Sequence, residues 1–125
     1  MNSEIEDRLK AINIENYIWI IYLGIIVLSY YSNNLEKDYF INKNETSKEK
    51  YRKVITFIFT ILVVVYYYFL KSSYKDLKNF SSYSEEKKKK VILSFISSLL
   101  IFISGLVFLY LAIEDKDLDV ELAFN

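Results

Sequence analysis

Three long stretches without a charged residue constrain this chain most. They cover residues 16–35, 54–70 and 91–113, and contain 20, 17 and 23 residues. A helix needs about 20 predominantly apolar residues, within a range of roughly 17 to 25, to cross the hydrocarbon core of a bilayer. All three stretches meet this requirement. The sequence therefore predicts an all-α integral membrane protein with three transmembrane helices.

We expect the helices at about residues 16–32, 47–79 and 84–113, with the membrane part of the second at 54–70 and short polar loops between them. The alternative is a soluble three-helix bundle, whose helices are apolar at only about three positions in seven. The stretch 91–113 is free of charge on every face for more than six helical turns. That pattern argues against a soluble bundle.

The remaining segments complete a single three-span domain over residues 1–125. In residues 1–15, Ile5, Leu9 and Ile12 share one helical face. This segment is either a short amphipathic helix on the membrane surface or a frayed polar extension of the first span. Residues 114–125 form an acidic C-terminal tail, which we expect to be disordered. Acidic residues alternate with others there, so an extended strand that joins a partner's sheet is the alternative.

Helix starts are predicted from two capping boxes, in which a Ser or Thr precedes a Glu by three residues. Thr46 with Glu49 predicts the start of the second helix, and Ser82 with Glu85 that of the third. The polar stretch 32–44 is expected to be the first loop.

The composition excludes several kinds of function. The chain has no Cys and no His, so it has no thiolate nucleophile, no Ser-His-Asp triad and no His or Cys ligands for a metal. No ionisable residue lies within a predicted span, which disfavours an ion-coupled transporter. A net charge of zero gives no electrostatic support for nucleic-acid binding. We expect no catalytic site, no cofactor and no metal.

Small and hydroxyl-bearing residues recur at three- and four-residue steps in the predicted spans. Such residues let helices approach closely and form hydrogen bonds across the contact. They are packing candidates within the three-helix unit, or they line a subunit interface or a pore. The candidates are Gly24 on the first helix, Thr56 and Thr60 on the second, and Ser94, Ser97, Ser98, Ser104 and Gly105 on the third.

A basic cluster precedes the third span, and it consists of Lys87, Lys88, Lys89 and Lys90. Lysines beside a membrane attract anionic lipid headgroups, although they also serve simply to set topology. The N-terminus and second loop carry nine Lys or Arg residues, against seven in the first loop and C-terminus. Because positive loops stay on the cytoplasmic side, the N-terminus is expected inside.

Two functions fit these observations. The first is a non-enzymatic membrane subunit that associates with itself as a homo-oligomer, or that serves as an accessory or scaffolding subunit for a membrane partner. The second is a small homo-oligomeric pore or channel lined by the serines of the third helix.

Overall fold

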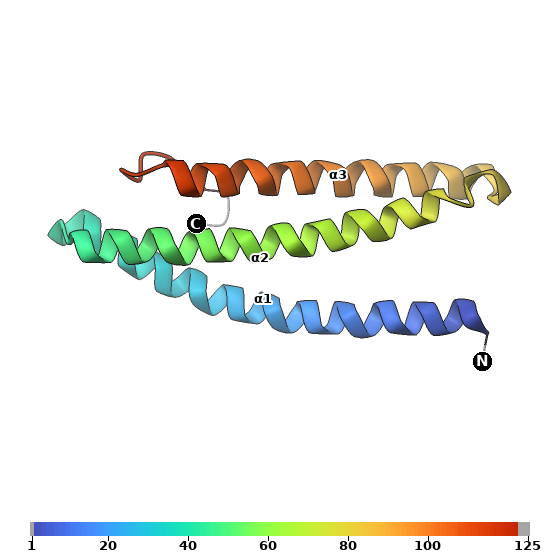
Figure 1. The fold of residues 1–125 in the computed structure, drawn as a ribbon, viewed down its shortest axis with the longest axis horizontal. Helices are drawn as coiled ribbons and strands as arrows, with labels where there is room; N and C mark the ends of the chain where they lie inside the picture. Colours follow the sequence, from blue (N-terminus) through green and yellow to red (C-terminus); the bar gives the residue numbers. More distant parts are fainter. Residues whose placement is uncertain (1, 123–125) are drawn as a thin grey trace. The chain divides into compact units, whose positions relative to one another are not determined.

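The computed structural model describes residues 2–122, in which three α-helices and one short 3-10 helix are present and no strand occurs (Figure 1). Their bounds are α1 Ser3–Asn42, α2 Glu45–Leu77, η1 Phe80–Ser82 and α3 Glu85–Glu114. By length and composition, α1, α2 and α3 are each able to cross a membrane. The all-α prediction with three long apolar helices is therefore confirmed. The chain divides into two compact units, Met1–Tyr51 and Arg52–Asn125.

Helix α1 is much longer than the sequence analysis predicted. It runs without a break for 40 residues, so the first loop expected at 32–44 is wrong, and residues 3–15 belong to the same helix as the apolar stretch. The polar residues of 32–42 include neither Gly nor Pro, and nothing else in that segment excludes a helix. The Asn2 side chain accepts a hydrogen bond of 2.9 Å from the Glu4 N–H at the start of α1.

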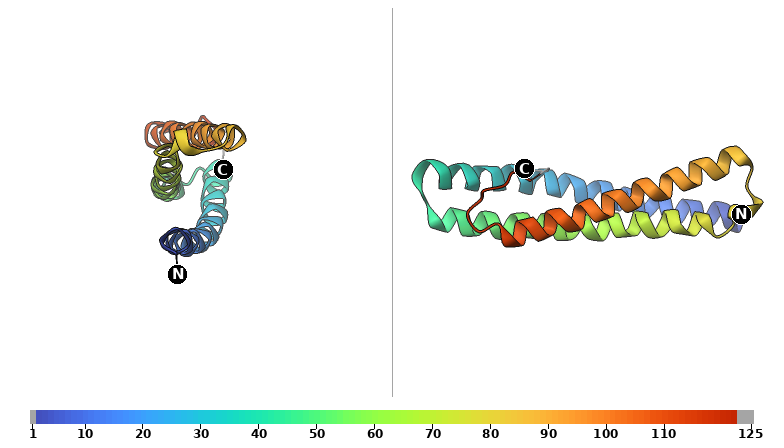
Figure 2. Two further views of the ribbon diagram at one scale, coloured as in Figure 1. Left: turned by 90° about the vertical axis from the view of Figure 1, so that its right-hand side faces the viewer. Right: turned by 90° about the horizontal axis from the view of Figure 1, so that it is seen from above.

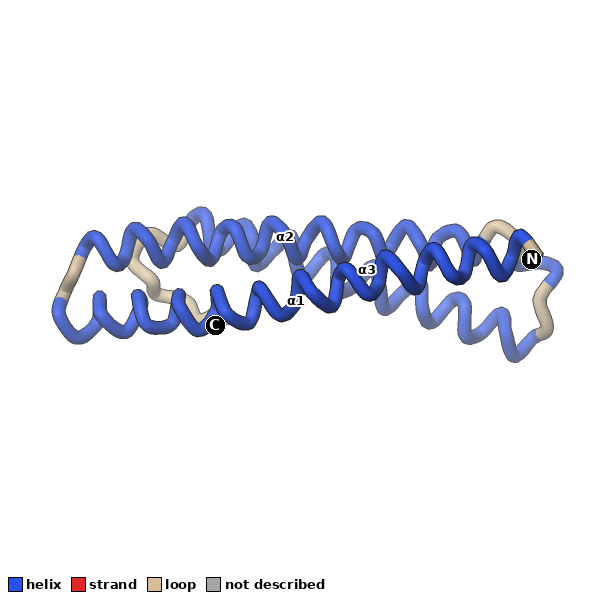
Figure 3. The backbone as a smooth tube through the Cα atoms, turned by 90° about the horizontal axis from the view of Figure 1, so that it is seen from below, coloured by secondary structure: helices blue, strands red, loops and turns tan. Residues whose placement is uncertain are grey.

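The loops between the helices are correspondingly short (Figure 3). Only Lys43 and Asn44 separate α1 from α2. Lys43 adopts a left-handed conformation with φ 55°, and its N–H bonds to the Tyr39 carbonyl at 2.8 Å. This is a common way for a helix to end.

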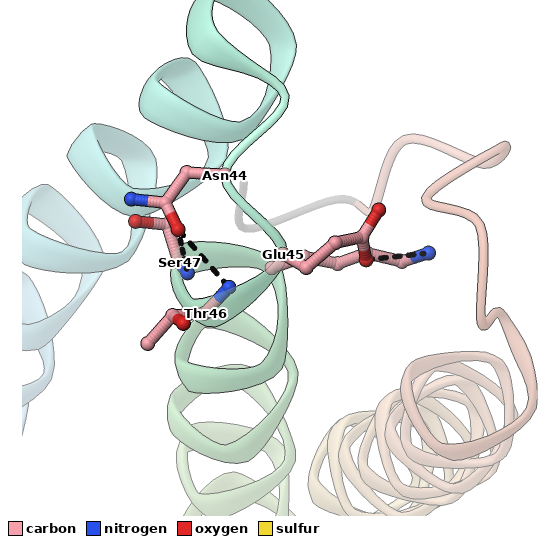
Figure 4. Close-up of polar contacts among 5 residues, drawn as sticks. Asn44, Glu45, Thr46 and Ser47 are labelled. Atoms are coloured by element: carbon pink, nitrogen blue, oxygen red, sulfur yellow. Dashed lines mark hydrogen bonds and ion pairs between the residues drawn. The ribbon is translucent and has the colours of Figure 1, made fainter.

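Both predicted capping residues are displaced by two positions. Helix α2 is capped by Asn44, not Thr46: the Asn44 Oδ1 accepts from the N–H groups of Thr46 at 3.1 Å and Ser47 at 3.4 Å (Figure 4). Helix α3 is capped by Ser84, whose hydroxyl accepts from the Lys87 N–H at 3.2 Å. Asn and Ser are both among the best N-caps. Asn44 lies two residues before the predicted cap of α2, whereas Ser84 lies two residues after the predicted cap of α3.

Within the second unit, α3 packs antiparallel to α2, and the two ribbons lie side by side in Figures 1 and 2. Three pairs of rings set the register: Phe59 with Phe108, Tyr67 with Phe102 and Tyr74 with Phe95, with centroids 5.7, 5.9 and 6.1 Å apart. The buried residues of α3 are spaced by multiples of seven residues, at Val91, Gly105 and Ala112. A seven-residue repeat is typical of α-helices that coil around each other in a left-handed supercoil.

The C-terminal end of α3 is held by polar contacts. The Arg52 guanidinium donates a hydrogen bond of 3.0 Å to the Ile113 carbonyl, one of the carbonyls that a helix end leaves without an internal partner. Beyond the helix, the Asp115 carboxylate accepts from the N–H groups of Asp119 and Val120, and Leu118 has φ 57°. The backbone of residues 115–120 is therefore held in a turn, and the strand considered for this tail is not formed in its described part, which ends at Leu122.

Candidate functional site

Gly105 lies against α2, next to Tyr66 and Val63. A Cβ atom at this position would stand 2.9 Å from Cδ2 of Tyr66 and 3.5 Å from Cγ2 of Val63. Real Cβ atoms do not tolerate the shorter contact without a shift of the neighbour. Gly105 therefore serves packing inside the α2–α3 hairpin.

Unlike Gly105, Gly24 is not packed against a neighbouring side chain. It is exposed near the middle of the apolar stretch of α1, and a Cβ atom there would meet no heavy atom within 4 Å. A glycine inside a helix costs about 1 kcal/mol relative to alanine. Among the described residues of its own unit, nothing within 4 Å of Gly24 makes use of the missing side chain.

The serines of α3 lie on two adjacent faces of the helix. Ser98 is half-buried and stands seven residues from both Val91 and Gly105, on the face against α2. Ser94, Ser97 and Ser104 are exposed. The serine candidates of α3 are therefore divided between a face packed against α2 and an exposed face.

The threonine pair on α2 is satisfied within its own helix. The Thr60 hydroxyl donates to the Thr56 carbonyl at 2.8 Å. Thr60 is exposed and Thr56 is half-buried. The Thr60 hydroxyl thus already has an acceptor without another helix.

The register of the hairpin shows the depth of each serine. Since Tyr74 pairs with Phe95 in an antiparallel contact, Lys75 lies level with Ser94, and Lys71 lies level with Ser98. The apolar stretch of α2 ends at Leu70. Ser94 and Ser97 therefore stand beside the polar end of α2, whereas Ser104 stands beside its apolar part.

The basic cluster is partly engaged by neighbours. Lys87 lies over the Tyr83 ring, 4.2 Å from its centroid. Lys88 pairs with Glu85 at 3.3 Å, and Lys90 pairs with Glu86 at 3.4 Å. The Lys87, Lys89 and Lys90 side chains are exposed, and exposed ion pairs contribute little stability. These lysines can accordingly exchange their present partners for another anion.

A polar cluster at the α1–α2 turn was missed in the sequence analysis. The Asp38 carboxylate accepts hydrogen bonds from Asn42 at 2.6 Å, from Asn44 at 2.8 Å and from the buried Ser47 hydroxyl at 2.5 Å. The one feature of the sequence that could have indicated this cluster is the four-residue step from Asp38 to Asn42. Ser47 belongs to the next helix, so its contact with Asp38 has no local pattern in the sequence. The cluster ties the two helix ends together across two loop residues.

This turn should weaken in acid. The hydrogen bond from Ser47, followed by the one from Asn42, lowers the pKa of Asp38 below its ordinary value of 3.8. A lowered pKa means that the contribution to stability is present above pH 3.8 and is lost as the pH falls through the folded pKa. Asp38→Asn should abolish this part of the acid sensitivity, while Asp7→Asn should leave it unchanged. The rates of amide hydrogen exchange at Thr46 and Ser47, compared between pH 5 and pH 3, measure the acid sensitivity of the turn. Equal acid sensitivity in both variants would contradict the role assigned to Asp38.

Within residues 2–122, no group of three or more His, Cys, Asp or Glu side chains could hold a metal ion. The features that remain are therefore surfaces: the Gly24 position on α1, the exposed serines of α3 and the basic cluster before them. Comparisons with protein-family models, with curated proteins and with solved structures give no match for this chain.

Proposed function

We propose that this chain is a small non-enzymatic multi-pass membrane protein that works as a self-associating or accessory subunit. Three helices with the length and composition to cross a membrane support the membrane location. The N-terminus is proposed to lie inside, because the N-terminal segment and the α2–α3 loop together carry more Lys and Arg than the other side.

The proposal of self-association rests on the open surroundings of Gly24. In a bilayer, helices associate mainly through close van der Waals packing, and small residues let two backbones approach. Gly105 fulfils this role inside the hairpin, and we expect Gly24, where an added Cβ atom would meet no residue of its own unit within 4 Å, to fulfil it for a helix of another copy. The neighbouring Tyr17, Ile20 and Val27 are exposed and would pack around that contact.

The mass of the purified protein in mild detergent tests this proposal. We expect the wild type to form a dimer or larger oligomer, and we expect Gly24→Leu to weaken association by tenfold or more because the larger side chain separates the backbones. Gly24→Ala should have an intermediate effect. Ile26→Phe adds volume on another exposed face of α1 and should leave association intact. A monomeric wild type, or equal behaviour of the Leu and Phe variants, would rule out association through Gly24.

A homo-oligomeric pore is the second candidate, because Ser94, Ser97 and Ser104 are exposed on α3. A conducting path needs polar positions along its whole length, and only Ser104 stands beside the apolar part of α2. We therefore expect no discrete conductance from purified protein in planar bilayers. A current blocked by thiol reagents at a cysteine introduced at Ser104 would establish the pore instead.

A further inference from the structure

Two lysines and two serines form one continuous face at the start of α3. Lys87, Lys90, Ser94 and Ser97 follow one another at three- and four-residue steps, which places them on one side of the helix. All four are exposed. In the described part of the chain, the hydroxyls of Ser94 and Ser97 make no hydrogen bond to another residue. We name these four residues the headgroup face.

The spacing along this face matches the layers of a bilayer. The polar layer on each side of the hydrocarbon core is about 5 to 8 Å thick. Four residues of helix separate Lys90 from Ser94, which corresponds to about 6 Å. Ser94 also lies level with Lys75 of α2, beyond the end of that helix's apolar stretch. If the lysines lie level with the lipid phosphates, Ser94 is at the depth of the ester groups.

We propose that the headgroup face binds an anionic phospholipid of the adjacent leaflet. The lipid phosphate lies between the ammonium groups of Lys87 and Lys90. The Ser94 hydroxyl donates a hydrogen bond to an ester carbonyl of the lipid. One acyl chain runs down α3 past Ser97 and the exposed Ile101.

Charge favours a lipid over a second copy of the chain as the occupant. Residues 71–90 contain seven lysines and three acidic residues, so this end of the hairpin has an excess of positive charge. Two copies related by a two-fold axis would bring the same faces together, with Lys87 and Lys90 next to their own counterparts. Like charges side by side oppose such a contact, whereas a phosphate neutralises them.

Native mass spectrometry of the full chain in a non-ionic detergent tests the proposal. The protein is titrated with phosphatidylglycerol and, separately, with phosphatidylcholine. We expect one tightly held phosphatidylglycerol and weaker binding of phosphatidylcholine. Lys87→Gln with Lys90→Gln should lower the affinity for phosphatidylglycerol about 25-fold, because each basic residue near the surface contributes about fivefold. Lys71→Gln with Lys75→Gln removes the same charge from α2 and should change the affinity less than about threefold.

Serine variants test the site without altering its charge. Ser94→Ala should lower the affinity for phosphatidylglycerol about fivefold, the effect of one lost hydrogen bond, while Ser104→Ala should not change it. Equal losses in the two lysine pairs would show a diffuse surface charge and would overturn the proposal. Equal binding of the two lipids, or no effect of Ser94→Ala, would overturn it as well. A lipid-free dimer that the Lys87 and Lys90 variants strengthen would show that a second copy occupies the face.

Discussion

Replacing Gly105 with leucine should destabilise the α2–α3 hairpin by about 3 kcal/mol, the upper part of the range for overpacking a closely packed contact. Even the first carbon of the new side chain would stand 2.9 Å from the Tyr66 ring. The remaining carbons would have to enter the same interface, so the helices would have to separate. Denaturation by SDS, followed by far-ultraviolet circular dichroism in mixed micelles, measures the loss.

Gly24→Leu is the matched control, because its Cβ atom meets nothing within 4 Å. It should change the unfolding of the monomer by less than about 1 kcal/mol, even though we expect it to weaken association. Tyr66→Ala should relieve part of the penalty in Gly105→Leu, which a double-mutant cycle would report as a coupling energy. Equal effects of the two leucine variants would contradict the packing described for Gly105.

Phe59→Ala should cost about 3 kcal/mol, as expected for a large buried aromatic side chain. Phe59 is 2 % exposed, and its ring stacks on Phe108 of α3 with the centroids 5.7 Å apart. Removing the ring leaves a cavity and ends that contact. The same SDS titration applies.

Phe57 provides a control of the same residue type on the same helix. Its side chain is 55 % exposed, so Phe57→Ala should cost less than about 1 kcal/mol. If Phe57→Ala proved as costly as Phe59→Ala, the face that α2 presents to α3 would have been assigned wrongly.

The sequence predicted the long helices well because their signal is the absence of charge over more than four turns. The same absence of charge meant that the sequence did not show which residues of α2 and α3 lie side by side. In a stretch that is apolar on every side, no polar residue marks the outer face, so the sequence could not show that Gly105 is packed and Gly24 is open. The ring contacts of α2 with α3 determine the position of Gly105, and they join residues far apart along the chain.

The errors at the helix ends have a local cause. A capping box needs only a Ser or Thr three residues before a Glu, and polar segments of this chain satisfy that pattern by composition alone. Asn44 caps α2 because Lys43 adopts the left-handed conformation that ends α1. The first loop was overestimated for a similar reason, since polar residues were read as a loop although Asp38 and Asn42 are hydrogen-bonded along a continuing helix.

The accessibility of four single cysteines tests the three-span account most directly. The chain has no native cysteine, and the exposed positions Ser3, Thr46, Ser81 and Lys116 stand before, between and after the three apolar stretches. With an impermeant thiol reagent applied to intact cells, the account predicts labelling at 46 and 116, and labelling at 3 and 81 only after permeabilisation. Labelling of all four positions alike, whether already in intact cells or only after permeabilisation, would show that the helices do not cross the membrane.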